Sequence, residues 1–219
     1  MKNSIQKFVI VSDFDGTISK KDFFTYATES ILTDNDMLPW LQYKKGQISH
    51  VNALNQIFNK IHLPKNEFDN FIDKIEIEEY FLPTLNLCRE KSIDFHIVSA
   101  GADYYILRIL ERIGAQNVNL LTNPSDYSQE RGLELYPPNK TFEFYDEDLG
   151  VSKKDFVLKL KSKGYFVLFA GDGMPDIDAA KVADVVFARD YLVDLCNRHN
   201  IQYKRFETYY DIYKYILEC

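Results

Sequence analysis

Several features are scarce in this sequence of 219 residues, and their scarcity excludes some classes of protein. Cysteine occurs three times, at Cys88, Cys196 and Cys219, with no Cys-x-x-Cys pair. That pattern supports neither a disulfide framework nor a zinc site, and it favours a reducing compartment. No apolar run approaches the roughly 18 residues that a membrane-spanning helix needs. The polar residues 1–7 do not resemble a signal peptide, so we expect a cytoplasmic protein without a membrane partner.

Positive charge is also in short supply. The chain has 26 lysines and arginines against 33 aspartates and glutamates, which gives a net charge of −7. Nucleic-acid binding depends on a basic stripe that replaces counterions, and the sequence has none, so nucleic acid is not an expected partner. What is present is an ordinary globular composition, with 46% hydrophobic and 27% charged residues. The length suits one large domain, or a core with one insertion.

Short buried strands alternate with helical stretches along most of the chain. Strands are predicted at 8–12, 95–99, 165–170 and 185–188, each followed by residues with helical character. This alternation predicts an α/β fold with a doubly wound, Rossmann-like parallel sheet. Residues 20–82 break the pattern, because their apolar residues recur at helical spacing and no strand is evident. We therefore expect a small helical cap at 20–82 on a core formed by 1–19 and 83–219.

A second irregular stretch, residues 124–148, contains glycine and proline and is predicted as a loop or a hairpin. Within the expected cap, Trp40 and Tyr43 belong either to the cap's own core or to a lid that faces the substrate. The four histidines are scattered without metal-ligand spacing. The chain is expected to be a monomer or a homodimer.

Carboxylates follow two of the predicted strands at the edge where parallel sheets bind ligands. Asp13 and Asp15 come directly after the first strand, and Asp172 and Asp176 follow the strand at 165–170. Clustered carboxylates repel one another, so a cation is implied, and oxygen ligands beside a phosphate suit Mg²⁺. Ser99 closes another strand just before a predicted helix, whose N-terminus favours anions.

The order of these motifs resembles the phosphatases of the haloacid dehalogenase superfamily. The resemblance rests on Asp-Phe-Asp-Gly-Thr at 13–17, Ser99, the lysines at 153–154 and Gly-Asp-Gly-x-x-Asp at 171–176. The helical insertion after the first motif is similar to the C1-cap subclass, which includes phosphoserine phosphatases. Residues 187–192 and the tyrosine-rich tail resemble the methionine-salvage phosphatases that act on 2-hydroxy-3-keto-5-methylthiopentenyl 1-phosphate.

This resemblance implies a role for each motif residue. Asp13 would be the nucleophile that forms an aspartyl-phosphate, and Asp15 the acid and then the base. The implied Mg²⁺ ligands are the side chains of Asp13 and Asp172 and the backbone carbonyl of Asp15, with Asp176 behind them or bound through water. The implied phosphate and substrate contacts are Ser99, Gly101, Lys153 and Asp22. Lys153 is preferred over Lys154 on its spacing to Asp172 in the methionine-salvage relatives, and a slip of one residue would exchange them.

Three activities fit the motifs. The first is Mg²⁺-dependent hydrolysis of a small phosphate monoester, and the second is a phosphotransferase or phosphomutase that passes the phosphoryl group to a sugar hydroxyl. The third, a non-catalytic phosphate-binding module, would lack Asp13 or Asp15, and both are present. Asp15 also argues against a dehalogenase, since a halide leaving group needs no proton.

Phosphoserine is expected to be a poor substrate. Asp22 stands where phosphoserine phosphatases carry a glutamate for the amino group, and Pro175 replaces an asparagine of the last motif. Gln56 stands about where an arginine would hold the substrate carboxylate. Without such a partner a buried carboxylate is strongly disfavoured. Neutral, hydroxylated or amine-bearing phosphates should therefore be better substrates.

Overall fold

Alternating buried strands organise residues 7–219, the part of the chain that the computed structural model describes. Six parallel strands form one sheet in the order β10-β9-β8-β1-β2-β3. The strands are β1 (Lys7–Ser12), β2 (Asp94–Ala102), β3 (Asn119–Asn123), β8 (Tyr165–Gly171), β9 (Val185–Ala188) and β10 (Lys204–Arg205). The predicted doubly wound α/β fold is thus confirmed. The polar start of the sequence lies outside the described residues, except for Lys7.

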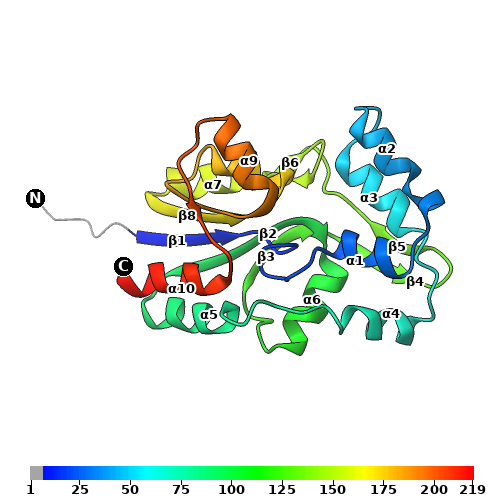
Figure 1. The fold of residues 1–219 in the computed structure, drawn as a ribbon, viewed down its shortest axis with the longest axis horizontal. Coiled ribbons are helices and arrows are strands. Elements are labelled where there is room, and N and C mark those ends of the chain that lie inside the picture. Colours follow the sequence, from blue (N-terminus) through cyan, green and yellow to red (C-terminus); the bar gives the residue numbers. More distant parts are fainter. Residues whose placement is uncertain (1–6) are drawn as a thin grey trace, which may run out of the picture.

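Helices cover both faces of the sheet (Figure 1). They are α5 (Phe81–Glu90), α6 (Asp103–Arg112) and α10 (Tyr209–Glu218) on one face, and α7 (Lys153–Ser162), α8 (Ile177–Ala180) and α9 (Asp190–Arg198) on the other. The central strand β1 serves both layers, because side chains alternate along a strand. Ile10 belongs to the hydrophobic cluster that includes α5, α6 and α10, while Val9 and Val11 belong to the cluster of α7, α8 and α9. β1 is therefore buried on both sides, and the loop that follows it is held firmly.

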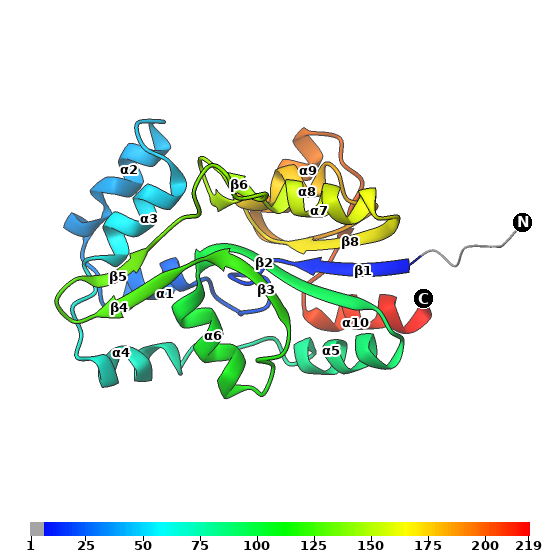
Figure 2. The same cartoon turned by 180° about the vertical axis from the view of Figure 1, so that it is seen from behind.

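Four helices and one 3-10 helix lie between β1 and α5, at one end of the sheet (Figure 2). They are α1 (Phe23–Ser30), η1 (Asp34–Met37), α2 (Leu38–Lys44), α3 (His50–Phe58) and α4 (Lys65–Ile72). Phe23 packs its ring edge against Phe58, Phe68 and Phe71, with centroids 5.1 to 6.2 Å apart. Phe23 also stacks on Tyr105 of α6, with centroids 4.2 Å apart, so the insertion shares one hydrophobic cluster with the face of the sheet that α5, α6 and α10 cover.

The stretch predicted as a loop or a hairpin contains two antiparallel pairs. They are β4 (Ser125–Ser128) with β5 (Gly132–Leu135), and β6 (Tyr145–Asp146) with β7 (Gly150–Val151). The β4–β5 hairpin packs on α3, where Leu135 N donates to Asn55 Oδ1 at 2.8 Å. A side chain at Gly132, whose φ is +73°, would lie 2.6 Å from the backbone of Asn59. We propose that the cap consists of the helices inserted between β1 and α5 together with the β4–β5 hairpin. The other segments from α5 onward would then belong to the core.

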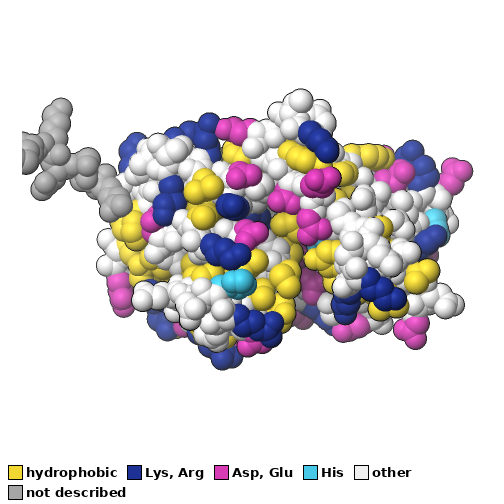
Figure 3. All heavy atoms as spheres, turned by 90° about the horizontal axis from the view of Figure 1, so that it is seen from above, with side chains coloured by type: hydrophobic (Ala, Val, Ile, Leu, Met, Phe, Trp, Pro, Cys, Tyr) yellow, Lys and Arg dark blue, Asp and Glu magenta, His cyan; other side chains and the backbone are white. Residues whose placement is uncertain are grey.

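The surface mixes charges of both signs. The face seen in Figure 3 carries acidic and basic side chains interspersed with apolar ones, without a continuous basic stripe. No helix among residues 7–219 is long and apolar enough to span a bilayer.

Candidate active site

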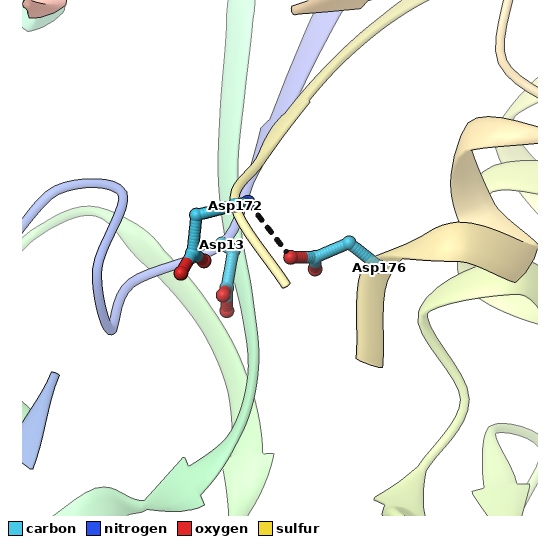
Figure 4. Close-up of side chains that lie close together, drawn as sticks. All are labelled: Asp13, Asp172 and Asp176. Atoms are coloured by element: carbon cyan, nitrogen blue, oxygen red, sulfur yellow. Dashed lines mark hydrogen bonds between the residues drawn. The ribbon is translucent and has the colours of Figure 1, made fainter. Parts of the chain in front are cut away.

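Two neighbouring strands bring the motif carboxylates together. β1 and β8 pair in parallel, so the loops that follow them start side by side, and Asp13 N donates to Ala170 O at 2.9 Å. Asp13, Asp172 and Asp176 each offer a carboxylate oxygen within 4.8 Å of the others. Their side chains converge from these strand ends and the start of the following helix (Figure 4). The structure thus assembles the acidic cluster from residues more than 150 positions apart in the sequence.

Lys153 lies between two of these carboxylates. Its ammonium nitrogen is 2.7 Å from Asp13 Oδ1 and 2.6 Å from Asp176 Oδ1, and its side chain is 2% exposed. Burial opposes the charged form of Lys153, but Asp13 and Asp176 outweigh it and raise the pKa of the ammonium. Lys154, the alternative, is exposed. Lys153 is therefore the lysine placed to offset negative charge at Asp13.

Asp176 is fully engaged in hydrogen bonds. Its Oδ1 accepts from Lys153, and its Oδ2 accepts from the backbone N–H of Gly173 at 2.9 Å. Its Oδ2 also accepts from the backbone N–H of Asp172 at 3.0 Å, the bond drawn in Figure 4. Asp172 receives a further bond from Thr17 Oγ1 at 3.1 Å. Because both oxygens of Asp176 are in use, this side chain orients Lys153 and the Asp172 loop.

The donor set suits a hard cation. Burial raises the pKa of Asp13 to about 7, helped by the charge of Asp176 and opposed by Lys153. Burial, Asp176 and Asp13 likewise raise the pKa of Asp172 well above its usual range. Asp13 Oδ1 is buried and pairs with the charge of Lys153, but it has no hydrogen-bond partner among the described residues. A cation bound by Asp13 and Asp172 would favour their charged forms, so these residues fit Mg²⁺.

Asp15 lies on the cap side of Asp13 and is held by three donors. Phe23 N donates to its Oδ1 at 3.0 Å, and the Tyr105 hydroxyl and Ser99 Oγ donate to its Oδ2. Burial raises the pKa of Asp15 to about 6, although the bonds from Tyr105 and Phe23 lower it. This carboxyl is therefore poised to exchange a proton near neutral pH.

Ser99 and Gly101 lie near the end of β2, where the pairing with β3 shifts register, and both are close to Asp15. Gly101 N donates to Ser99 Oγ at 2.9 Å, so a phosphate bound at this amide would replace that bond. A side chain at Gly101 would lie 1.9 Å from the Tyr105 hydroxyl and 2.7 Å from Asp15 Oδ2. Glycine is thus required here by the close approach of Tyr105 and Asp15.

A cavity of about 280 Å³ opens between this cluster and the cap. Its acidic wall includes Asp13, Asp15, Asp22 and Asp172, and no lysine or arginine lines it among the described residues. The cap contributes a wall that is mostly apolar, formed by Phe24, Thr25, Trp40, His50, Leu54 and Phe58. Asp22 also caps α1, because its Oδ1 accepts from Thr25 N at 2.7 Å.

Comparison with known proteins identifies the chain's relatives. It is 32% identical over 211 residues to the 2-hydroxy-3-keto-5-methylthiopentenyl-1-phosphate phosphatase of Exiguobacterium sibiricum, with 93% of each chain covered. It is 31% identical over 222 residues to the enzyme of that name from Bacillus mycoides, with 98% of each chain covered. The chain belongs to this phosphatase family. It is a phosphoric monoester hydrolase of the haloacid dehalogenase superfamily. No family model matches the sequence.

The fold of this phosphatase matches solved structures. A phosphoserine phosphatase captured as a phospho-aspartyl intermediate analogue superposes with a TM-score of 0.68 at 18% identity, covering 96% of this chain and 99% of that one. A substrate-bound phosphoserine phosphatase gives a TM-score of 0.67 at 18% identity, with 96% and 98% coverage. At this identity the match establishes the shared fold.

Two features of this phosphatase were not predicted from its sequence. Tyr105 hydrogen-bonds Asp15, and nothing in its local pattern distinguishes it from a core aromatic. Arg189 follows β9 directly and is 8% exposed. It donates to Gly16 O at 2.6 Å, to Thr17 O and Ser19 O at 3.3 Å each, and to Glu78 Oε1 at 2.8 Å. The sequence did contain one indication of a role for Arg189, because a charged residue directly follows the strand predicted at 185–188.

Gln56 does not lie where the sequence suggested. It is exposed on α3, whereas His50, Leu54 and Phe58 share the face of that helix that lines the cavity. A helix turns 100° per residue, and Gln56 is two residues from both Leu54 and Phe58. Its side chain therefore points away from the face that these two residues share. No lysine or arginine among residues 7–219 lines the cavity, so its wall offers no permanently charged partner for a substrate carboxylate.

Proposed function

We propose that this phosphatase hydrolyses a small phosphate monoester in a Mg²⁺-dependent reaction through an aspartyl-phosphate on Asp13. The observation that carries the proposal is the buried Asp13 carboxylate, which is 2.7 Å from Lys153 and lines the same cavity as Asp15. Water then releases inorganic phosphate. Under this proposal Asp13 and Asp15 are catalytic residues, and Asp172 completes the metal site.

Charge decides which groups the first step needs. Attack by a carboxylate on a phosphate dianion brings like charges together at a cost of about 8 kcal/mol, taking two unit pairs at 4 Å in an effective dielectric of 20. Lys153 offsets part of this repulsion at the Asp13 end. Mg²⁺ bound by Asp13, Asp172 and the backbone carbonyl of Asp15 would supply further positive charge at the phosphate. Positioning and charge compensation carry most of the catalysis in phosphoryl transfer.

Asp15 handles the protons. In its protonated form it donates to the ester oxygen as the P–O bond breaks, and the carboxylate then accepts a proton from the attacking water. Its pKa of about 6 supports this double role. The bonds from Phe23 N and Tyr105 keep the carboxyl oriented while it changes charge.

The cavity also restricts the substrate. Four aspartates and no lysine or arginine line the described cavity, so we propose that the substrate carries no negative charge away from its phosphate. The apolar cap wall suits an apolar end group, such as the methylthio group named in the substrate of the relatives. We propose that the physiological substrate is an ester of that kind and that phosphoserine is a poor substrate. Gly101 lines the cavity, whereas Ser99 and Lys153 are not part of its lining. All three remain the proposed phosphate contacts, and Asp22 a contact for a hydroxyl or an amine.

A phosphate-release assay over a panel of metabolite monoesters tests this proposal. With Mg²⁺ present, we expect neutral esters with an apolar end to exceed phosphoserine by at least about tenfold in kcat/KM, since an unpaired buried carboxylate is disfavoured by at least 1–3 kcal/mol. Transfer of phosphate to an added sugar in place of release would instead favour a phosphotransferase. A preference for phosphoserine would contradict the proposed substrate specificity but would not contradict the proposed reaction at Asp13.

A further inference from the structure

His50 lines the catalytic cavity from the cap, and its imidazole ring has no hydrogen-bond partner among residues 7–219. The residue is only 8% exposed, and its Nδ1 is enclosed by protein without a partner. Buried polar side-chain atoms are nearly always hydrogen-bonded, so an unpartnered ring at the wall of a binding cavity requires an explanation. Nδ1 is enclosed, so a ligand in the cavity can reach only the other ring nitrogen, Nε2, which makes no hydrogen bond among the described residues either.

The structure nevertheless fixes the position of His50. Its backbone N donates to Asp148 Oδ1 at 2.7 Å, and the next residue, Val51, donates to Asp148 O at 2.8 Å. Asp148 lies in the turn between β6 and β7, so this contact ties the first turn of α3 to the core. Trp40 and Tyr43 pack edge-on against the imidazole, with centroids 5.7 and 5.3 Å away. The ring is therefore held in place through its backbone and its apolar edges.

The chemistry of the ring limits what it can bind. Burial lowers the pKa of His50 to about 4, and the charge of Lys153 acts in the same direction. The imidazole is thus neutral near pH 7, and it does not attract an anion as a cationic side chain would. Because Nδ1 is enclosed, Nε2 is the nitrogen that remains for the cavity, where it can donate to a carbonyl or exchange a hydrogen bond with a hydroxyl.

We propose that His50 is a specificity residue whose Nε2 hydrogen-bonds an uncharged oxygen, a carbonyl or a hydroxyl, on the alcohol portion of the phosphate ester. This oxygen lies between the phosphate site and the apolar wall formed by Phe24, Trp40, Leu54 and Phe58. The inference rests on the proposed phosphatase function and adds a polar subsite to it. The cap thus selects esters that carry both an oxygen and an apolar end.

Kinetics with matched esters test this subsite. The substrates are butyl phosphate and butyl phosphates that bear a hydroxyl or carbonyl oxygen at carbon 2 or carbon 3. We expect the wild-type chain to prefer at least one oxygenated ester by about tenfold in kcat/KM, the factor that about 1.4 kcal/mol corresponds to. In His50→Phe this preference should fall to about twofold or less, because the ring shape is kept and the nitrogen is lost.

Two conservative variants locate the nitrogen responsible. A glutamine amide can reach the position of Nε2, whereas the shorter asparagine amide reaches only that of Nδ1. His50→Gln should therefore retain most of the preference, and His50→Asn should lose it. Gln56→Ala, an exposed position on the same helix, is the matched control and should behave as the wild-type chain does. Equal preference in His50→Phe and the wild-type chain would overturn the proposal.

A second measurement does not depend on how the variants fold. Butylphosphonate and its oxygenated analogues resist hydrolysis, so each can be added with Mg²⁺ to the wild-type chain while the ¹⁵N signals of His50 are recorded. We expect Nε2 to shift with an oxygenated phosphonate and not with butylphosphonate, and identical responses would refute the subsite. Failure of the proposed function is a different result, since the wild-type chain would then release phosphate from none of the esters.

Discussion

The two walls of the catalytic cavity are built on opposite principles. On the core wall, Asp13, Asp15 and Asp172 follow buried strands. Asp13 forms an ion pair with Lys153, and Asp15 and Asp172 accept hydrogen bonds from Tyr105 and Thr17. On the cap wall, side chains such as Phe24 and Trp40 are held by ring contacts, with centroids 4.4 Å apart. Hydrogen bonds fix direction, whereas aromatic packing fills space. We therefore expect the core wall to determine the rate with every substrate and the cap wall to select among substrates.

Substitution of the nucleophile should have the largest effect. Asp13→Asn keeps the size of the side chain but is a poor nucleophile, so kcat should fall about a thousandfold or more with every ester. Asp15→Asn should lose most of its activity with alkyl esters and less with p-nitrophenyl phosphate, whose leaving group needs no proton. Initial rates of phosphate and p-nitrophenol release measure both effects. Residual activity of more than a few per cent in Asp13→Asn would remove the covalent mechanism.

Removal of the metal should abolish phosphatase activity with every substrate. Activity should vanish in EDTA, return with Mg²⁺ and be inhibited by Ca²⁺, which takes more ligands at longer distances. Full turnover in excess chelator would rule out the metal site described here.

The sign of the pH effect follows from the raised pKa values of Asp13, about 7, and Asp15, about 6, against about 4 in an unfolded chain. Between these limits the folded chain binds more protons than the unfolded one, so the metal-free protein should lose stability as pH rises from 4 to 7. The Tm gained on adding Mg²⁺ should accordingly be larger at pH 8 than at pH 5. Thermal melts at several pH values check this, and an equal gain at both would count against a metal bound by these carboxylates.

The contrast between the walls also explains what the sequence could predict. Asp13, Asp15 and Asp172 were predictable because a buried strand next to a carboxylate is a local pattern, and parallel strands meet at one edge. The cap wall depends on which face of α3 is turned inward, which is decided by contacts with the β4–β5 hairpin far along the chain. His50 was therefore considered only as a metal ligand, and Gln56 was placed near a site whose lining does not include it.

Some features of the core could not be predicted from the sequence either. They are the strands β3 and β10 and the Arg189–Glu78 ion pair. β10 has two residues and β3 has five with mixed polarity, so neither forms the apolar run that reveals β1 or β8. Glu78 lies 111 positions before Arg189, and only the assembled sheet brings the two together. Tertiary contacts of this kind leave no mark in local spacing.

Arg189 supports the core wall from behind, and its loss should cost stability. Arg189→Gln leaves Glu78 buried without its charged partner, with only the bond from Tyr209 N remaining, and removes the donors to Gly16, Thr17 and Ser19. Breaking one side of a buried ion pair destabilises by about 3–5 kcal/mol. Urea denaturation should reveal this loss, and kcat should fall for all esters together because the loop that carries Asp15 loosens. The double variant Glu78→Gln with Arg189→Gln should recover part of the lost stability. A loss below about 0.5 kcal/mol in the free energy of unfolding of Arg189→Gln alone would contradict a supporting role for Arg189.

The smallest effect is expected on the cap wall. Phe24→Leu keeps the position apolar but removes part of the surface that meets the end of the substrate. KM should rise about three- to tenfold for an ester with an apolar end and stay nearly constant for glycerol phosphate, because a small loss of apolar contact is worth about 1 kcal/mol. Leu41→Ala on the neighbouring helix α2 is the control, since Leu41 is 52% exposed and does not line the cavity. An equal loss of kcat with both esters would mean that Phe24 supports the catalytic geometry, and the division of labour between the two walls would be wrong.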